Sequence, residues 1–214
     1  MEADAYRTVA AEAEAEFTEK RSRFIGAVCP VSDEAAARDF IQRRTKAHWD
    51  ARHNVPAYIL EHGALCRFSD DGEPQGTAGL PVLEVLRKEG LTDCAIVVTR
   101  YFGGILLGGG GLVRAYSHAA KLALDAAGVV CMRRCLTAEI ACSYAQYGYL
   151  PALIAAQGGT VTDTRFDTAV TVCFTLPQPQ QAALEAALTE RSAGTLTMTV
   201  TGSRYAAFPT EKQS

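Results

Sequence analysis

The stretch VTRYFGGILLGGGGLVRAY, residues 98–116, places six glycines between Arg100 and Arg114. Glycine loses more conformational freedom on folding than any other residue, so this density of glycines needs a structural or functional reason. The residues before the glycines belong to an apolar run that is typical of a buried strand. The residues after them keep one apolar face at helical spacing until Gly128. The stretch therefore predicts a strand, a glycine-rich loop and a helix.

Such a loop has two alternative roles. The first amides of a helix have no partners inside the helix and lie at the positive end of its dipole, so the loop suits an anion such as phosphate. Arg100 and Arg114 would each add a guanidinium. However, GGILLGGGG matches neither the GxxxxGK[ST] phosphate loop nor the GxGxxG dinucleotide motif. The glycines can equally serve turns and close packing while the arginines pair with carboxylates.

The sequence before this stretch predicts further strands and helices of one domain. Residues 9–31 indicate a hairpin that turns at 18–21, and Ser32 is the expected cap of the helix that follows. In chain order we expect a helix over 33–48, a strand over 55–62, a helix over 79–90 and a strand over 93–99.

The sequence after Gly128 has a different order of elements. A short connection over 128–135 is followed by strands and helices in the order βαββαβ, which is the ferredoxin-like arrangement. The predicted elements are strands over 137–144, 160–166, 168–176 and 195–205, and helices over 146–158 and 179–194. We therefore predict an α+β protein with domains at 1–133 and 137–206 and a flexible tail at 207–214.

Composition limits the classes of function. The net charge of -3 argues against non-specific coating of nucleic acid, which needs many basic contacts. The seven cysteines include no CxxC pair and no metal-ligand spacing, so we expect reduced thiols in a cytoplasmic protein. No signal peptide and no apolar run of membrane-spanning length is present, so we expect no membrane association.

A second unusual stretch, SDDGEPQGTAGLP at residues 69–81, gathers Asp70, Asp71 and Glu73 around one glycine. These carboxylates could ligate Mg²⁺ or act as a general base, they could accept the arginines, or they could simply form a turn. An arginine that leaves a buried strand must satisfy its donors, so we predict that Arg100 pairs with Asp70 or Asp71.

The segment HWDARHN, residues 48–54, brings His48, Asp50 and His53 close together in sequence. Two histidines and an aspartate suggest a metal site, but no third strong ligand is near. The favoured interpretation is a helix end with surface histidines and a partly buried Trp49, and we expect no metal.

Four motifs in this order resemble the IMPACT family, and its bacterial members in particular. They are KRSRFIGA at 20–27, HWDARHNVPAY at 48–58, SDDGEPQGTAGLPVLEVL at 69–86 and VVTRYFGGILLGGGGLVRAYSHAA at 97–120. The resemblance implies an amino-terminal domain like the second domain of ribosomal protein S5, followed by a ferredoxin-like domain. Eukaryotic members regulate translation through a protein partner of a stress kinase, and bacterial members are presumed to bind nucleic acid or the translation machinery.

The residues and the resemblance lead to two main function hypotheses, and a purely scaffolding role through the ferredoxin-like sheet is a third. The first is a non-enzymatic binding protein of the translation machinery that contacts RNA, the ribosome or a protein partner through a groove in the amino-terminal domain. The alternative is a hydrolase or phosphotransfer enzyme acting on a small phosphorylated or peptide-like substrate. We expect no cofactor.

The predicted groove comprises Asp70, Asp71, Glu73, Arg100, Tyr101, Gly103, Gly104, Gly110, Gly111 and Arg114, with basic contacts from Lys20, Arg21 and Arg23. Within it, the amides of residues 109–112 should bind an anion with help from Arg114.

Overall fold

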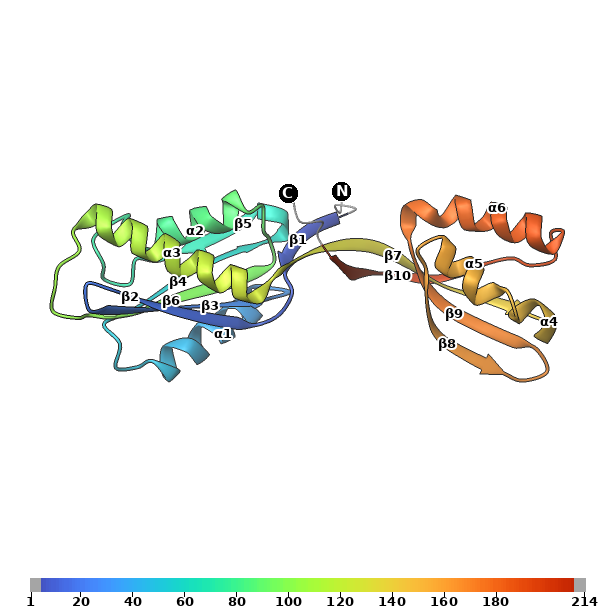
Figure 1. Cartoon of the computed structure of the whole chain (residues 1–214), viewed down its shortest axis with the longest axis horizontal. Helices are drawn as coiled ribbons and strands as arrows, with labels where there is room; N and C mark the ends of the chain where they lie inside the picture. The colour runs from blue at the N-terminus through green and yellow to red at the C-terminus, as the bar shows by residue number, and fades with distance from the viewer. Residues whose placement is uncertain (1–4, 210–214) are drawn as a thin grey trace. The chain divides into compact units, whose positions relative to one another are not determined.

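The computed structural model describes residues 5–209. These residues divide into two compact units: Met132–Ala206 forms one, and the preceding chain with residues 207–209 forms the other. Each unit combines an antiparallel sheet with helices (Figure 1). The predicted α+β class is thus confirmed.

The first unit is built on a sheet with the strand order β2-β3-β6-β4-β5, in which all neighbours are antiparallel. The strands are β2 (Ala13–Glu19), β3 (Ser22–Pro30), β4 (His53–Leu60), β5 (Leu65–Phe68) and β6 (Cys94–Tyr101). The predicted hairpin is formed by β2 and β3, whose connecting residues Lys20 and Arg21 both have positive φ. Both side chains are exposed at its tip.

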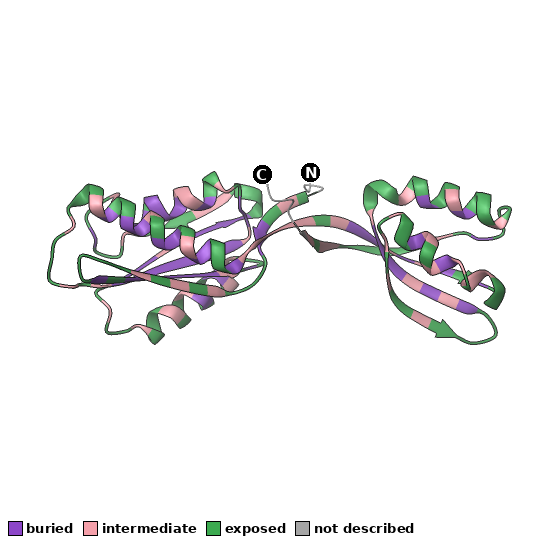
Figure 2. Ribbon diagram, in the orientation of Figure 1, coloured by how far each residue is buried: buried purple, intermediate pink, exposed green. Residues whose placement is uncertain are grey.

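Helices cover both faces of this sheet. Helix α1 (Glu34–Ala47) packs Ala37 and Phe40 against one face, in a core with Ala95 and Val97 of β6. Helices α2 (Gly79–Lys88) and α3 (Gly109–Ala127) pack against the other face. Buried residues alternate with exposed ones along α3 (Figure 2), and the buried ones belong to the same core as residues of β3, β4 and β6. Strand β1 (Ala5–Val9) and the short 3₁₀ helix η1 (Glu61–Gly63) complete the unit.

The period of two along β6 sends neighbouring side chains to opposite faces. Arg100 pairs in register with Phe24 of β3 and with His53 of β4. These three positions lie on the face covered by α2 and α3. Val98 and Val55, each two residues away along the same strands, belong to the core between this face and the two helices. Tyr101 follows on the face covered by α1.

In the second unit β9 pairs with β7 and β8, β10 also pairs with β7, and helices lie between the strands along the chain as in the ferredoxin-like arrangement. Its core is a separate cluster that includes Ile140, Phe174 and Leu184. The elements are β7 (Val129–Cys142), α4 (Tyr144–Tyr147), α5 (Leu150–Ala156), β8 (Thr160–Phe166), β9 (Val170–Pro177), η2 (Gln178–Gln180), α6 (Gln181–Ser192) and β10 (Thr199–Pro209).

Three local expectations were wrong. The predicted connection over 128–135 is mostly strand, because β7 pairs with β10 as well as β9 and so begins at Val129. The predicted tail is strand β10 as far as Pro209, and residues 210–214 lie outside the described residues. The helix over 146–158 is split into α4 and α5 around Gly148. Glycine at that point and Pro151 just after it favour an interruption.

The cap of α1 was displaced by one residue. Asp33, rather than Ser32, is the N-cap, and its Oδ1 accepts the Ala36 amide at 2.8 Å. An N-cap oxygen must reach an amide two or three residues further along, and Asp33 stands at that distance. Among the described helices, none is long and apolar enough to cross a membrane.

Candidate functional site

A pocket of about 450 Å³ lies beside the amino terminus of α3. Its walls come from the start of β4, the acidic turn, the end of β6 and the glycine-rich loop. The lining residues are Arg52, His53, Glu73, Pro74, Arg100, Phe102, Leu106, Leu107, Gly108, Gly109 and Leu112. Two arginines and a histidine thus face one carboxylate across an otherwise apolar wall.

Glu73 is held by two donors from different elements. Arg100 donates from Nη1 to Glu73 Oε1 at 2.6 Å, and Tyr116 of α3 donates its hydroxyl to the same oxygen at 2.8 Å. The side chains of the ion pair are only 6% and 4% exposed. Burial, and then the adjacent Glu73 charge, raise the pKa of Tyr116, so its hydroxyl stays a donor. The Glu73 carboxylate is therefore committed to the protein's own groups.

Arg100 has donors that the described chain leaves unused. Its guanidinium carries five N–H groups, yet the bond to Glu73 is the only hydrogen bond it makes within residues 5–209. The buried Nε atom has no partner there. Phe24 and Phe102 lie with ring centroids 5.5 and 5.4 Å from Cζ, and such contacts engage the π-face of a ring rather than an acceptor. Arg100 is thus a buried cation at the pocket wall with capacity for an anion.

His53 has its tautomer fixed by a backbone carbonyl. Its Nδ1 lies 2.6 Å from the carbonyl oxygen of Asp71, which can only accept, so Nδ1 carries the proton. The other nitrogen, Nε2, lies 3.7 Å from Glu73 Oε1 at the pocket. The Asp71 carbonyl therefore holds the imidazole in place beside the ion pair.

The first two carboxylates of the acidic turn have structural roles. Asp70 accepts the amides of Gly76, Ala78 and Gly79 at 2.8 to 3.1 Å, at the start of α2. Burial opposes ionisation of Asp70, but these three bonds outweigh it and lower the pKa of the carboxyl. Asp71 accepts the Asn54 amide. The expected partner of Arg100 was therefore in the right turn but at the wrong residue, because Asp70 and Asp71 are used by backbone amides and Glu73 is not.

The glycines of the loop serve both packing and the pocket. Gly103 lies so close to the hairpin tip that a Cβ there would be 2.0 Å from the Arg21 carbonyl carbon. Gly108, at φ 71°, is the N-cap of α3, and no side chain caps this end among the described residues. Gly104 has positive φ in the open loop. The amides that begin α3 are thus left without a side-chain partner at the pocket.

The structure does not place Arg114 with Arg100. Arg114 and Gly111 line a neighbouring pocket of about 230 Å³, together with Lys20 and His118. Gly110 lies next to Arg114, whose Nη1 is 3.8 Å from where a Cβ would stand. The two arginines lie apart because Arg100 projects from the sheet, whereas Arg114 is an exposed residue on the first turns of α3.

Tyr101 and Arg23 belong to the opposite face of the sheet. Tyr101 accepts from His48 Nδ1 at 3.0 Å and donates to Asp50 at 3.1 Å. Arg23 pairs with Glu16 of β2. Their placement in one groove with Arg100 was wrong, because alternation along the strands separates them. Arg21 stays exposed at the hairpin tip.

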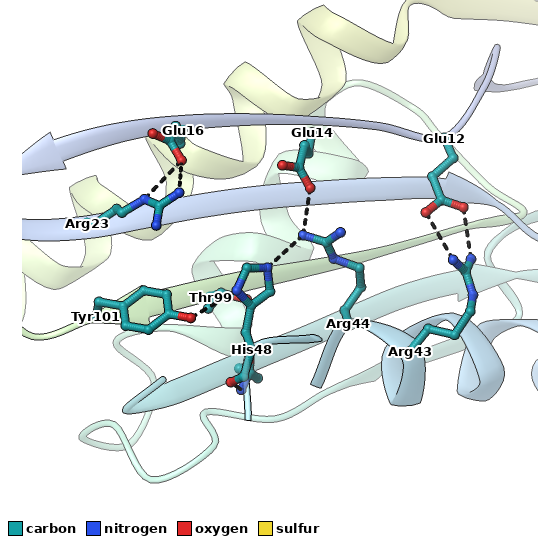
Figure 3. A network of polar contacts seen from close by, with 10 residues as sticks. Glu12, Glu14, Glu16, Arg23, Arg43, Arg44, His48, Thr99 and Tyr101 are labelled. Carbon is teal, nitrogen blue, oxygen red and sulfur yellow. Dashed lines mark hydrogen bonds and ion pairs between the residues drawn. The ribbon is translucent and has the colours of Figure 1, made fainter. Parts of the chain in front are cut away.

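Polar contacts on this opposite face link the chain at and just before β2 to α1 and to β3 (Figure 3). Its ion pairs are Glu12 with Arg43, Glu14 with Arg44 and Glu16 with Arg23. Arg44 also donates to His48 Nε2 at 3.1 Å. Burial, and then the Arg44 charge, lower the pKa of His48. The network is therefore built around a neutral imidazole.

His48 and His53 consequently serve different faces and do not share a metal site. Within residues 5–209, no three His, Cys, Asp or Glu side chains are grouped to hold a metal. Trp49, expected to be partly buried, is 82% exposed. Arg52, His53, Phe102 and the leucines of the loop were absent from the predicted groove. The alternation along β4 was the available signal for His53, since Val55 and Ala57 on the same face pack in the core under α2 and α3.

Two family models match the chain in succession. Residues 20–124 match the Impact N-terminal domain, and residues 140–195 match a domain of unknown function, DUF1949. The first match contains every residue that lines the pocket.

Relatives match over different shares of the chain. IMPACT family member YvyE of Bacillus subtilis is 50% identical over 126 residues, which is 58% of each protein, so the match spans little more than half of that relative. IMPACT family member YigZ of Escherichia coli is 35% identical over 182 residues, covering 83% of this chain and 88% of the relative. A crystal structure of a hypothetical protein has 32% identity and a TM-score of 0.59, over 92% of this chain and 98% of that one. The chain therefore belongs to the IMPACT family.

Proposed function

We propose that this protein is a cytoplasmic binding protein of the translation machinery, and that its first unit contacts RNA through phosphate groups. One observation carries the proposal: Arg52, His53, Arg100 and the uncapped start of α3 meet at one pocket. The only carboxylate there, Glu73, is already neutralised by Arg100. Guanidinium groups and helix amides are the groups that bind nucleic-acid phosphates most often. All seven cysteines are free thiols, which supports a reducing compartment.

The neighbouring pocket extends this cationic surface. Lys20 and Arg114 line it, and Leu107 of the glycine-rich loop lines both pockets. A phosphate backbone that passes over this loop would therefore meet basic groups on both sides of it. Glu19 is the acid on the second wall, so the number of phosphates neutralised should be small. Binding should accordingly be modest and sensitive to salt.

The enzyme alternative has lost the residues on which it rested. Asp70 and Asp71 accept backbone amides, and Glu73 accepts Arg100 and Tyr116. Each carboxylate considered as metal ligand or general base is thus occupied by the protein. A binding role needs none of them to be free.

The test is a titration of short single-stranded RNA into the full chain at two salt concentrations. The double variant Lys20→Ala, Arg114→Ala removes two exposed cations beside the loop, and Lys88→Ala removes an exposed cation at the far end of α2. The double variant should bind more weakly and lower the slope of log affinity against log salt by about 0.7 for each phosphate that it no longer neutralises. Lys88→Ala should match the wild type. Absence of RNA binding by the wild type, or an unchanged slope in the double variant, would contradict the proposal.

A further inference from the structure

We propose that the pocket beside α3 recognises the terminal phosphomonoester of a nucleotide. The phosphate would lie against Arg100 and the first amides of α3, and the nucleoside would lie along the apolar wall. This inference deepens the proposed function at the same site, since it names the group recognised. It does not require the ligand to be a long RNA, because a free nucleotide offers the same chemistry.

The depth of Arg100 favours a terminal phosphate. Arg100 is 5% exposed and lines the pocket, so an anion must enter the pocket to reach its guanidinium. An internal phosphodiester has a ribose on each side, and both would have to follow it inward. A phosphomonoester has one substituent and three terminal oxygens. It can therefore fill the inner end of the pocket while the rest of the nucleotide points outward.

The donors there suit a doubly charged tetrahedral group. Arg100 offers N–H groups in the plane of its guanidinium, and Gly109 brings the start of α3 to the same pocket. Arg52 is exposed at the wall and adds a second positive charge. These groups come from three separate elements, so they approach the anion from different directions. That arrangement matches several oxygens better than the two coplanar oxygens of a carboxylate.

The apolar wall indicates what the phosphate is attached to. Pro74, Phe102, Leu106 and Leu112 line the pocket, and its volume of about 450 Å³ far exceeds that of one phosphate group. Phe102 is 48% exposed, although its ring lies against the buried Arg100 guanidinium. An exposed aromatic ring next to an anion site can stack on a nucleobase. Inorganic phosphate alone would leave this wall uncovered.

The test uses the full chain and three probes: adenosine monophosphate, a ten-nucleotide RNA with a 5′-phosphate, and the same RNA with a 5′-hydroxyl. Titration calorimetry gives the affinity of each. We expect the mononucleotide to bind. The phosphorylated RNA should bind about tenfold more tightly than the hydroxyl form, because hydrogen bonds to the charged phosphate are present only in the phosphorylated RNA. Free nucleotide should compete with the phosphorylated RNA.

Two variants locate the site. Arg52→Ala and Phe102→Ala change exposed residues, so both proteins should fold. Each should weaken mononucleotide binding at least about fivefold, because one removes a positive charge and the other removes a stacking surface. Phe68→Ala is the matched control, because Phe68 is 47% exposed and does not line the pocket. It should bind like the wild type.

The outcomes separate this inference from the proposed function. RNA binding that ignores the 5′-phosphate, with no mononucleotide binding, overturns the inference and leaves the proposed function standing. Mononucleotide binding that depends on Arg52 and Phe102, without any RNA binding, supports the inference and overturns the proposed function. A peptide carboxylate that displaces the mononucleotide at lower concentration overturns the phosphate assignment.

Discussion

Replacing Glu73 with Gln should destabilise the first unit by removing the charge that faces Arg100. The two side chains meet at 2.6 Å and are 4% and 6% exposed, so bulk water screens the pair little. Removing one partner of a buried ion pair costs about 3–5 kcal/mol of unfolding free energy. The Gln amide oxygen can still accept from Arg100 and Tyr116, so we expect the lower end of that range, about 3 kcal/mol.

Hydrogen exchange of the β6 amides in urea measures this loss of stability in the full chain, because it reports on the first unit alone. Glu84→Gln is the matched control: Glu84 pairs with Arg87 at 2.8 Å, and these side chains are 42% and 48% exposed. It should change the unfolding free energy by less than about 1 kcal/mol. Equal effects from the two substitutions would refute the claim that Arg100 depends on Glu73 because both are buried.

Three further substitutions or titrations test other parts of the first unit. Gly26→Ala would place a Cβ 2.3 Å from the Ala119 carbonyl oxygen, so it should lower the melting temperature and reduce the free energy of unfolding by about 3 kcal/mol. An unchanged melting temperature would show that α3 can move away from the sheet. Asp70→Ala removes the acceptor of three amides at the start of α2 and should cost about 2 kcal/mol in chemical denaturation. Because the pKa of His48 is lowered on folding, the unfolded chain binds more protons below the ordinary histidine pKa, so stability should fall as the pH drops below about 6.5. His48→Gln should reduce that slope, and an equal slope in both proteins would assign the pH dependence to other groups.

The sequence predicted most elements of the fold because their signals are local. The hairpin turn, the helix ended by Gly90 and the helix ended by Gly128 all depend on residues within a few positions of each boundary. Strand β7 was missed at its start because its pairing with β10 is remote in sequence. The residues around the start of β7 do not reveal a strand partner that lies more than sixty residues further along the chain.

The candidate site was predicted less well, for a geometric reason. The sequence brought Arg100 and the acidic turn together through the need to satisfy a buried cation. It favoured Asp70 or Asp71 over Glu73 and was wrong, because that choice depends on where backbone amides of α2 and β4 point. Arg114 was misplaced because proximity in sequence across a loop does not decide which side of a helix a residue takes. Arg52 reaches the pocket through its backbone hydrogen bond to the Arg100 carbonyl, which the sequence alone does not reveal.

The parity of β6 also decides where this chain can change length. Deleting or inserting one residue within Cys94–Val98 would turn the side chains of Arg100 and Tyr101 to the opposite faces of the sheet. The Arg100 guanidinium would then leave Glu73, and the Tyr101 phenol would leave His48. One such event would therefore damage both polar networks at once, although they lie on opposite faces. The exposed loop over 104–106 has no strand partner to keep in register. Length variants engineered there should keep the fold, and they offer a way to widen or narrow the pocket without altering its charged residues.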